Sequence, residues 1–267
     1  KLLTTDSLRS FGMLKWIKYN VHYIALSLFI VCWALIIIFI SQKLLAADNE
    51  IWMDQSGATA NIDLEQQGSG NLIGGVGSVA GTPTDFDFIG TTNTLDIDQI
   101  GSSNLWKGDI TADNYTGLFL FTGSSNEMTV ATDTSNTYGA DSSDINVAVT
   151  GSSNTLTLNQ ATSALAATLD LDWIIQGSNN TITSSINIDG ATNYMDIDGS
   201  DNAVTYTGTG VTASAGGYFW LDHTGGSRTF NVTQASTLAS DWVKITSDGS
   251  NGTICVQQDD QGTAVGC

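Results

Sequence analysis

Apolar and polar residues alternate in short runs along most of the chain after residue 55, which is the pattern of half-buried β-strands. In the clearest run Asn93, Leu95, Ile97 and Gln99 share one parity, so they point to the same face of a strand. The residues between them, two of which are aspartates, point to the opposite face, towards water. Each such run is therefore predicted to be a strand with one buried face.

The predicted strands end in turns of the form Gly-x-x-Asn. Residues 101–104 read Gly-Ser-Ser-Asn, with a glycine free to take positive φ and an asparagine that tolerates it. From Gly101 onward such turns recur every 22 to 28 residues, with Arg228 and Gly252 in place of the asparagine in the last two, and looser turns lie between them. We assign Gly57 to the same set, although it precedes the next member by only 11 residues. The other predicted turn glycines are Gly68, Gly101, Gly123, Gly151, Gly177, Gly199, Gly225 and Gly249.

A repeat of this length, divided into two strands and two turns, is typical of a β-solenoid. We therefore predict an all-β solenoid of about eight two-strand coils over residues 48–267, with coils roughly 4.8 Å apart. The chain's one proline, Pro83, falls between Gly74 and Asp85. Because proline interrupts strand pairing, this stretch is predicted to be an insertion.

The inward parity also places amide side chains inside the coil, where they need hydrogen-bond partners. We predict that they stack into ladders, which fix the register because a one-residue slip would turn the apolar side chains outward. Two of them, Gln66 and Gln234, are expected in the terminal coils. The predicted ladder residues are Gln66, Asn93, Gln99, Asn104, Asn154, Gln160, Asn180 and Gln234.

At these residues the chain resembles the curlin repeats of bacterial curli-type amyloid fibres, whose repeat reads S-x5-Q-x-G-x-x-N-x-A-x3-Q. Residues 66–71 and 99–104 match the central Q-x-G-x-x-N, and 93–99 and 154–160 match the spacing from Asn to the closing Gln. The family's internal Ala is Leu, Met, Val or Phe here, its Ser is mostly absent, and the repeats vary in length. The resemblance covers about residue 55 to the C-terminus and implies a subunit of extracellular fibres.

The first 47 residues differ in composition from the rest. Residues 21–40 carry no formal charge and form a run long enough to span a bilayer. We expect an export helix within 1–47, either a signal peptide cleaved near Ala46 and Ala47 or a retained anchor. The predicted location of the remaining chain is extracellular or at the cell surface, with membrane contact only through 21–40 if this segment stays uncleaved.

The chain beyond residue 47 is strongly acidic. It holds three Lys and Arg against 26 Asp and Glu, a net charge of −23. This charge argues against binding nucleic acid or an anionic membrane through a basic patch. We interpret the outward aspartates as a soluble surface that also resists premature stacking.

Candidate chemical groups are few, and we expect neither catalysis nor a cofactor. His223, the one histidine beyond residue 47, is interpreted as an inward member of a polar ladder, because it lies two residues before Gly225 as Gln99 lies before Gly101. Asp222 beside it faces the opposite side, which argues against catalysis. Asp170 and Asp172 resemble the paired acids of polysaccharide-cleaving β-helices but are interpreted as plain surface.

One acidic turn is a candidate metal site. Asp196, Asp198 and Asp201 surround a glycine as the ligands of calcium loops do, but the distal bidentate Glu is missing. We therefore prefer a solvated acidic turn. Cys255 and Cys267 are the cysteines of the exported part, and a disulfide between them would pin the last coil; free thiols or an intermolecular bridge are the alternatives.

These features predict an exported structural protein that stacks into curli-like amyloid fibres for adhesion, surface coating or biofilm. Its partners are copies of itself, other fibre subunits and an export apparatus. The alternative is a solenoid that does not polymerise, such as an adhesin or the stalk of a virion or surface fibre. A carbohydrate-active β-helix enzyme is a third hypothesis and would need acids that converge in a groove.

Overall fold

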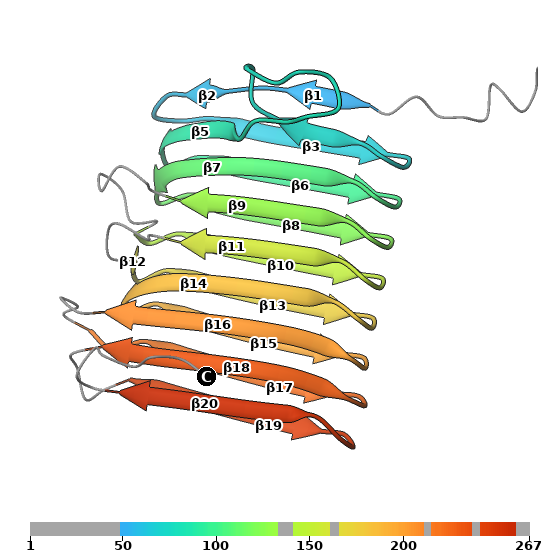
Figure 1. The fold of residues 1–267 in the computed structure, drawn as a ribbon. Helices are drawn as coiled ribbons and strands as arrows, with labels where there is room; N and C mark the ends of the chain where they lie inside the picture. The colour runs from blue at the N-terminus through green and yellow to red at the C-terminus, as the bar shows by residue number, and fades with distance from the viewer. Residues whose placement is uncertain (1–48, 133–140, 161–165, 211–214, 237–240, 260–267) are drawn as a thin grey trace, which may run out of the picture. The chain divides into compact units, whose positions relative to one another are not determined.

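The structure is a computed structural model that describes residues 49–132, 141–160, 166–210, 215–236 and 241–259. All regular elements in these ranges are β-strands (Figure 1). The strands are β1 (Glu50–Trp52), β2 (Gln55–Ser56), β3 (Asn61–Gln67), β4 (Leu72–Gly74), β5 (Phe86–Thr91), β6 (Thr94–Ile100), β7 (Leu105–Asp113), β8 (Thr116–Thr122), β9 (Glu127–Thr132), β10 (Asp144–Thr150), β11 (Thr155–Gln160), β12 (Ala166–Ala167), β13 (Asp170–Gln176), β14 (Thr181–Asp189), β15 (Thr192–Asp198), β16 (Asn202–Gly210), β17 (Tyr218–Thr224), β18 (Arg228–Ser236), β19 (Trp242–Asp248) and β20 (Thr253–Asp259).

The predicted export segment, 21–40, lies outside the described residues. Within the described ranges, no helix has the length and apolarity that crossing a membrane requires. Residues 48–267 form one compact unit.

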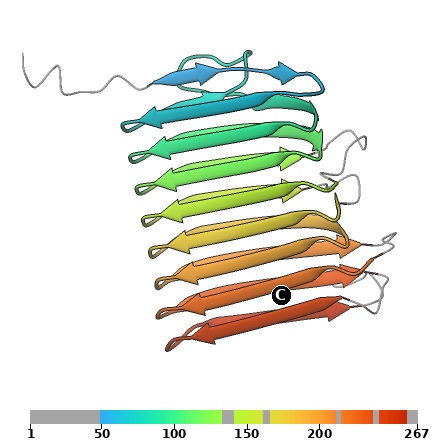
Figure 2. The same ribbon diagram turned by 180° about the vertical axis from the view of Figure 1, so that it is seen from behind.

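The strands form two parallel sheets that the chain visits in turn. The larger sheet follows the order β1-β4-β7-β9-β11-β14-β16-β18-β20, with β2, β5 and β12 off this path, and the smaller sheet runs β19-β17-β15-β13-β10-β8-β6-β3. Each strand of the smaller sheet and the strand after it make one coil (Figures 1 and 2). Eight such coils run from β3–β4 to β19–β20, so the predicted β-solenoid is confirmed.

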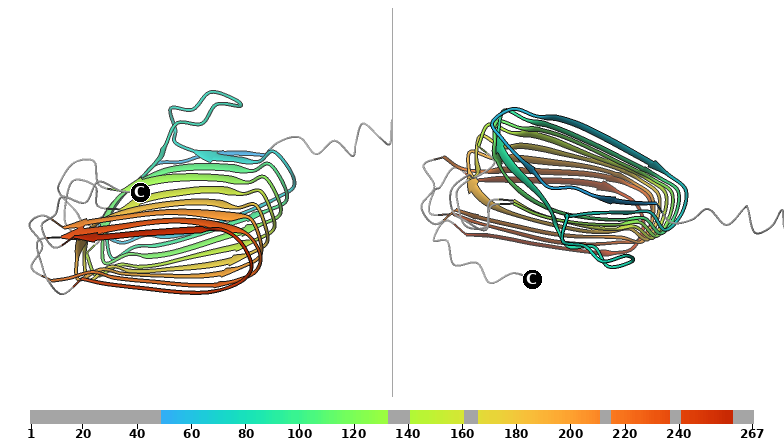
Figure 3. Two further views of the ribbon diagram at one scale, coloured as in Figure 1. Left: turned by 60° about the horizontal axis from the view of Figure 1, so that its bottom comes forward. Right: turned by 90° about the horizontal axis from the view of Figure 1, so that it is seen from above.

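The core lies between the two sheets, which face each other across it (Figure 3). Burial alternates residue by residue as predicted: on β6 Leu95, Ile97 and Gln99 are fully buried, while the residues between them are partly exposed. Large side chains from both sheets meet in the middle, and the rings of Trp106 on β7 and Phe119 on β8 lie 4.7 Å apart. Each fully buried side chain of this size contributes about 1.5–3 kcal/mol.

The predicted insertion is also present. β4 ends at Gly74 and β5 begins at Phe86, and the residues between them form a loop at the N-terminal end of the solenoid (Figure 1). The ladder continues in register across the loop, because Trp52 pairs with Gly74 while Gln55 pairs with Phe88. The loop therefore interrupts one rung without shifting the coil.

The outer faces of the two sheets differ in chemistry. On the larger sheet Thr129, Thr157, Thr183 and Thr205 follow one another on successive rungs. Threonine suits such a surface because β-branched side chains pack well on a pleated sheet. The smaller sheet instead carries eleven acids on its outer face: Asp63, Glu65, Asp96, Asp98, Asp144, Asp170, Asp172, Asp196, Asp198, Asp222 and Asp248.

Candidate functional site

The turns at one end of each coil stack into a column of glycines. A Cβ atom on Gly151 would lie 1.9 Å from the carbonyl oxygen of Gly123, the equivalent residue of the preceding coil. No side chain fits such a gap, so the column requires glycine. All of the predicted turn glycines except Gly57 join it: Gly68, Gly101, Gly123, Gly151, Gly177, Gly199, Gly225 and Gly249. Gly57 stacks instead on Gly90 at the opposite end of the coil, which corrects its assignment.

In the turn 101–104 the glycine has positive φ as predicted (130°), and the second residue with positive φ is the third of the turn, not the asparagine. Ser103, Ser153 and Asn179 have φ values of 61°, 62° and 60°. The asparagine after them instead starts the next strand with its side chain buried, as Asn104 does. The expectation that this asparagine tolerates positive φ was therefore wrong, because its side chain is needed inside the coil.

The buried asparagines form one continuous ladder along the solenoid. The backbone N–H of Asn104 donates to Oδ1 of Asn126 (3.0 Å), and that of Asn154 donates to Oδ1 of Asn180 (3.0 Å). Each side chain thus satisfies a backbone donor of the preceding coil. The full ladder is Asn71, Asn104, Asn126, Asn154, Asn180 and Asn202. Our predicted set left out three of these, although the Gly-x-x-Asn spacing that they share identifies them.

Asn93 is buried as predicted but belongs to a different column. Its Oδ1 accepts a hydrogen bond from the N–H of Ala60 (2.6 Å), at the end of the coil opposite to the asparagine ladder. The next coils hold Tyr115 and Ser143 at this position, and Ser143 Oγ accepts from the N–H of Tyr115 (3.2 Å). The ladder on this side is therefore short and mixed.

The four predicted glutamines are all buried, yet they do not form one ladder. Gln99 Nε2 donates to Gln66 Oε1 (3.1 Å) in the smaller sheet. Gln160 lies in the larger sheet, where it donates to the hydroxyl of Tyr115 (3.0 Å), and Gln234 donates to a backbone carbonyl (2.6 Å). Gln234 also lies on β18 rather than in the last coil, which corrects its expected terminal position.

The structure also contains a serine ladder that we did not predict from the sequence. Its serines occupy the second position of the glycine turns. Each serine hydroxyl accepts a hydrogen bond from the backbone N–H of the equivalent residue in the next coil. The distances from backbone nitrogen to hydroxyl shorten along the column, from 3.4 Å at Ser124 to 2.8 Å at Gly226. The signal that predicts it is the recurrence of Gly-Ser at the start of the turns.

His223 has the inward position that its parity predicts and is 3% exposed. Its Nε2 lies 3.1 Å from the carbonyl oxygen of Gly199, which fixes the tautomer with the proton on Nε2, so Nδ1 accepts from the hydroxyl of Ser247 at 2.9 Å. Burial lowers the pKa of His223. Asp222 lies on the outer face, so the two side chains do not form a catalytic pair.

The outer acids of the smaller sheet lie above one another because the strands are in parallel register. Asp96 follows Asp63, and burial together with that neighbour raises the pKa of Asp96. Burial and the carboxylates of Asp170 and Asp144 raise the pKa of Asp172 in the same way. Asp170 and Asp172 are thus members of this repulsive surface.

The candidate calcium ligands do not come together. Asp196 and Asp198 lie on β15, and Asp201 is the third residue of the turn that follows. Among the described residues, no group of three His, Cys, Asp or Glu side chains is arranged to hold a metal ion. Cys255 faces outward and is disulfide-bonded, whereas Cys267 lies outside the described residues.

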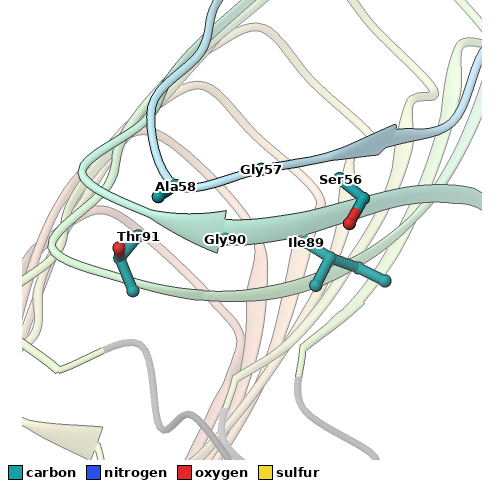
Figure 4. Close-up of a pocket in the computed structure, with 6 residues that line it drawn as sticks. All are labelled: Ser56, Gly57, Ala58, Ile89, Gly90 and Thr91. Carbon is teal, nitrogen blue, oxygen red and sulfur yellow. The ribbon is translucent and has the colours of Figure 1, made fainter.

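A small hollow lies where β2 and β5 end, at the Gly57–Gly90 column (Figure 4). Its volume is about 220 Å³, and its lining consists of Ser56, Gly57, Ala58, Ile89, Gly90 and Thr91. The two glycines leave this corner open because they have no side chains. None of the lining residues is ionisable, so the hollow offers no acid or base.

No family model, curated protein or solved structure matches this chain. Inferences about its function therefore depend on its own residues.

The most distinctive surface is the end of the last coil. On β20, Ile254 and Val256 are 39% and 46% exposed, whereas their neighbours on β18, Phe230 and Val232, are 0% exposed. Within the described part of the chain, no strand pairs with the outer edge of β20 or of β19. Side chains in core positions are therefore accessible at this end.

Proposed function

We propose that the protein is a structural subunit that stacks end to end into extracellular fibres, so that it acts by association rather than catalysis. The observation that carries this proposal is the exposure of Ile254 and Val256, which continue the buried columns of the core. Edge strands with unpaired backbone groups are templates for another chain. A second copy would bury these side chains and extend both sheets.

The opposite end offers a matching strand. On β3 the inward residues are Ile62, Leu64 and Gln66, and the first two are only partly buried. The corresponding inward residues of β19 are Val243, Ile245 and Ser247, in the same three columns of the smaller sheet. Both ends thus present two apolar side chains followed by a polar one.

The acidic outer face sets the conditions for assembly. Copies in a fibre would place the carboxylates of neighbouring molecules close together, and their repulsion would slow association. Salt screens charges over about 10 Å at 0.1 M ionic strength. Assembly should therefore be faster at higher salt. If the chain is exported, whether it then stays anchored or is released, it would assemble in surroundings of about this ionic strength.

The test is electron microscopy of the purified 48–267 segment over days, at low and high salt and with preformed seeds. We expect unbranched filaments whose growth quickens with salt, and fibre diffraction with a meridional spacing of roughly 4.8 Å. A segment that stays monomeric under all of these conditions contradicts the fibre proposal.

In that case an adhesin or surface stalk is the better proposal, because the outer face of the smaller sheet carries exposed rings. Tyr218 and Trp242 are 48% and 42% exposed, and their centroids lie 6.2 Å apart. Trp220 lies beside them, with Nζ of Lys244 3.5 Å from its centroid. Exposed aromatic groups of this kind are enriched at binding surfaces.

A further inference from the structure

The two sheets contain different numbers of rungs. The path through the larger sheet has nine strands, from β1 to β20, whereas the smaller sheet has eight, from β3 to β19. The difference arises because the described chain both enters and leaves the solenoid on the larger sheet. β1 and β2 together make the extra rung, 50–56, at the N-terminal end (Figure 1).

This difference restricts how copies can stack head to tail. If β1 and β2 of one copy pair with β20 of another, β3 and β19 are left two levels apart, and the smaller sheet lacks one strand. If β3 pairs with β19 instead, β20 needs the level that β1 and β2 occupy. Both sheets can therefore continue through a junction only if rung 50–56 leaves its place.

Rung 50–56 is also the least secured rung at this end. Its two strands have three and two residues, and its inward Ile51 and Met53 are only partly buried. The next rung is the one that it covers, and there Ile73, Phe86 and Phe88 are 0% exposed. Removing the short rung would uncover a well-formed apolar surface on β4 and β5.

β20 carries a sequence that fits this surface. Its inward residues Ile254, Val256 and Gln258 repeat the pattern apolar, apolar, glutamine. Rung 50–56 has the same pattern, Ile51, Met53 and Gln55. The register places the two sets in the same columns of the larger sheet, because β1 pairs with β4, β2 with β5, and the ladder then continues rung by rung to β20.

We propose that rung 50–56 is a displaceable cap, and that β20 of a second copy takes its place against β4 and β5 when the protein assembles. β19 of that copy then pairs with β3, so both sheets run unbroken through the junction. This inference rests on the proposed fibre function and adds a control step to it: a copy whose cap is in place cannot be extended at its N-terminal end.

Two carboxylates of the rung, one at its start and one between β1 and β2, hold the cap in place. Oδ1 of Asp54 accepts hydrogen bonds from the N–H groups of Val76 and Asp87, both at 3.2 Å. Oε1 of Glu50 accepts from the N–H of Gly81 at 2.8 Å. Two of these three donors, Val76 and Gly81, lie in the 75–85 loop, so this loop fastens the cap.

The first test compares two variants of the full chain in mild detergent, Asp54→Ala and Glu65→Ala. Glu65 lies on the outer face of β3, in a column that ends at the neutral Thr246 of β19. Both remove one negative charge at the N-terminal end, but only Asp54 fastens the cap. We expect seeded elongation, followed by light scattering, to be roughly tenfold faster for Asp54→Ala, a factor that corresponds to about 1.4 kcal/mol. Glu65→Ala should stay close to the parent chain. Equal acceleration by both variants overturns the cap and leaves only a charge effect.

The second test identifies the junction by cross-linking. Thr253 is in the column of Glu50 and Leu72, whose side chains point outward. A full chain with Thr253→Cys is assembled with one carrying Leu72→Cys or, separately, Glu50→Cys, and linked peptides are identified by mass spectrometry. If the cap is displaced, residue 253 of one copy should be linked to residue 72 of the other. A 253–50 link, or filaments with neither link, overturns the displaceable cap but leaves the fibre function standing. If none of these variants forms filaments, the fibre function itself is contradicted.

Discussion

At the scale of single residues, glycine and asparagine shape the turns for different physical reasons. Gly151 is required because its missing side chain lets two turns approach until a Cβ would touch the neighbouring carbonyl. Asn180 is required because its side chain carries both an acceptor and a donor. Its Oδ1 accepts from the N–H of Asn154, and its Nδ2 donates to the carbonyl of Gly151 at 3.2 Å.

Replacing Asn180 with Leu tests the ladder at one rung. Leucine has a similar size, but it leaves the buried N–H of Asn154 without an acceptor, and such a group costs roughly 1–3 kcal/mol. We expect Asn180→Leu to lower the free energy of unfolding by that amount in chemical denaturation. Thr181→Ala, at the exposed neighbouring position, should change it little. Equal effects would show that the buried amide does not stabilise the coil.

The sequence predicts which residues face inward better than it predicts their partners. Parity along a strand identified Gln99 and Gln160 as buried, and both are fully buried. Parity does not say to which sheet a strand belongs, so these two glutamines were wrongly joined in one ladder. The positive φ of Gly101 was predicted correctly, but that of Ser103 was missed, because Gly-Ser-Ser-Asn holds several residues that can adopt such a conformation.

At the scale of elements, the regular register that builds the sheets also concentrates negative charge. Asp98 on β6 lies beside Glu65 of β3, and Asp96 beside Asp63, on one outer face. Burial raises the pKa of Asp98, and the nearby carboxylates of Asp96, Glu65 and Asp63 raise it further. The solenoid fold could be predicted from periodicity, whereas these stacked acids depend on the register between strands.

The stacked acids should make the solenoid more stable in mild acid than at neutral pH. A carboxyl group with a raised folded-state pKa binds its proton more readily in the folded chain. Stability therefore increases as the pH falls through the raised value, and the gain is complete below the ordinary aspartate value of about 3.9. We expect the melting temperature to rise as the pH is lowered from 7 towards this value.

His223 opposes this trend, because its lowered pKa makes the folded state resist protonation. Stability from His223 is present above the ordinary histidine pKa of about 6.5 and is lost as the pH falls towards the lowered value. The measurement is therefore made on His223→Gln, which places in this column the residue that Gln66 and Gln99 provide elsewhere. Asp96→Asn with Asp98→Asn should flatten the rise. A melting temperature that falls with acid in His223→Gln contradicts the prediction.

At the scale of the whole solenoid, the central coils and the two ends differ in kind. Every inward side chain of a central coil has a coil above and below it, so its burial is complete. The last rung has a neighbour on one side among the described strands, and its inward side chains are exposed. The periodic sequence cannot reveal this difference, because Ile254 and Val256 follow the same pattern as Phe230 and Val232.

Val256→Asp separates assembly from stability. Val256 is 46% exposed in the single molecule, so the new carboxylate stays hydrated and the melting temperature should change little. A stacked copy would bury it, at a cost of several kcal/mol for an unpaired charge, and seeded elongation should stop. Gln257→Asp adds the same charge to the outer face of β20 and should still elongate, whereas Val232→Asp should prevent folding because Val232 is fully buried. If Val256→Asp elongates as fast as the parent chain, the exposed face of β20 is not the surface on which the next copy stacks.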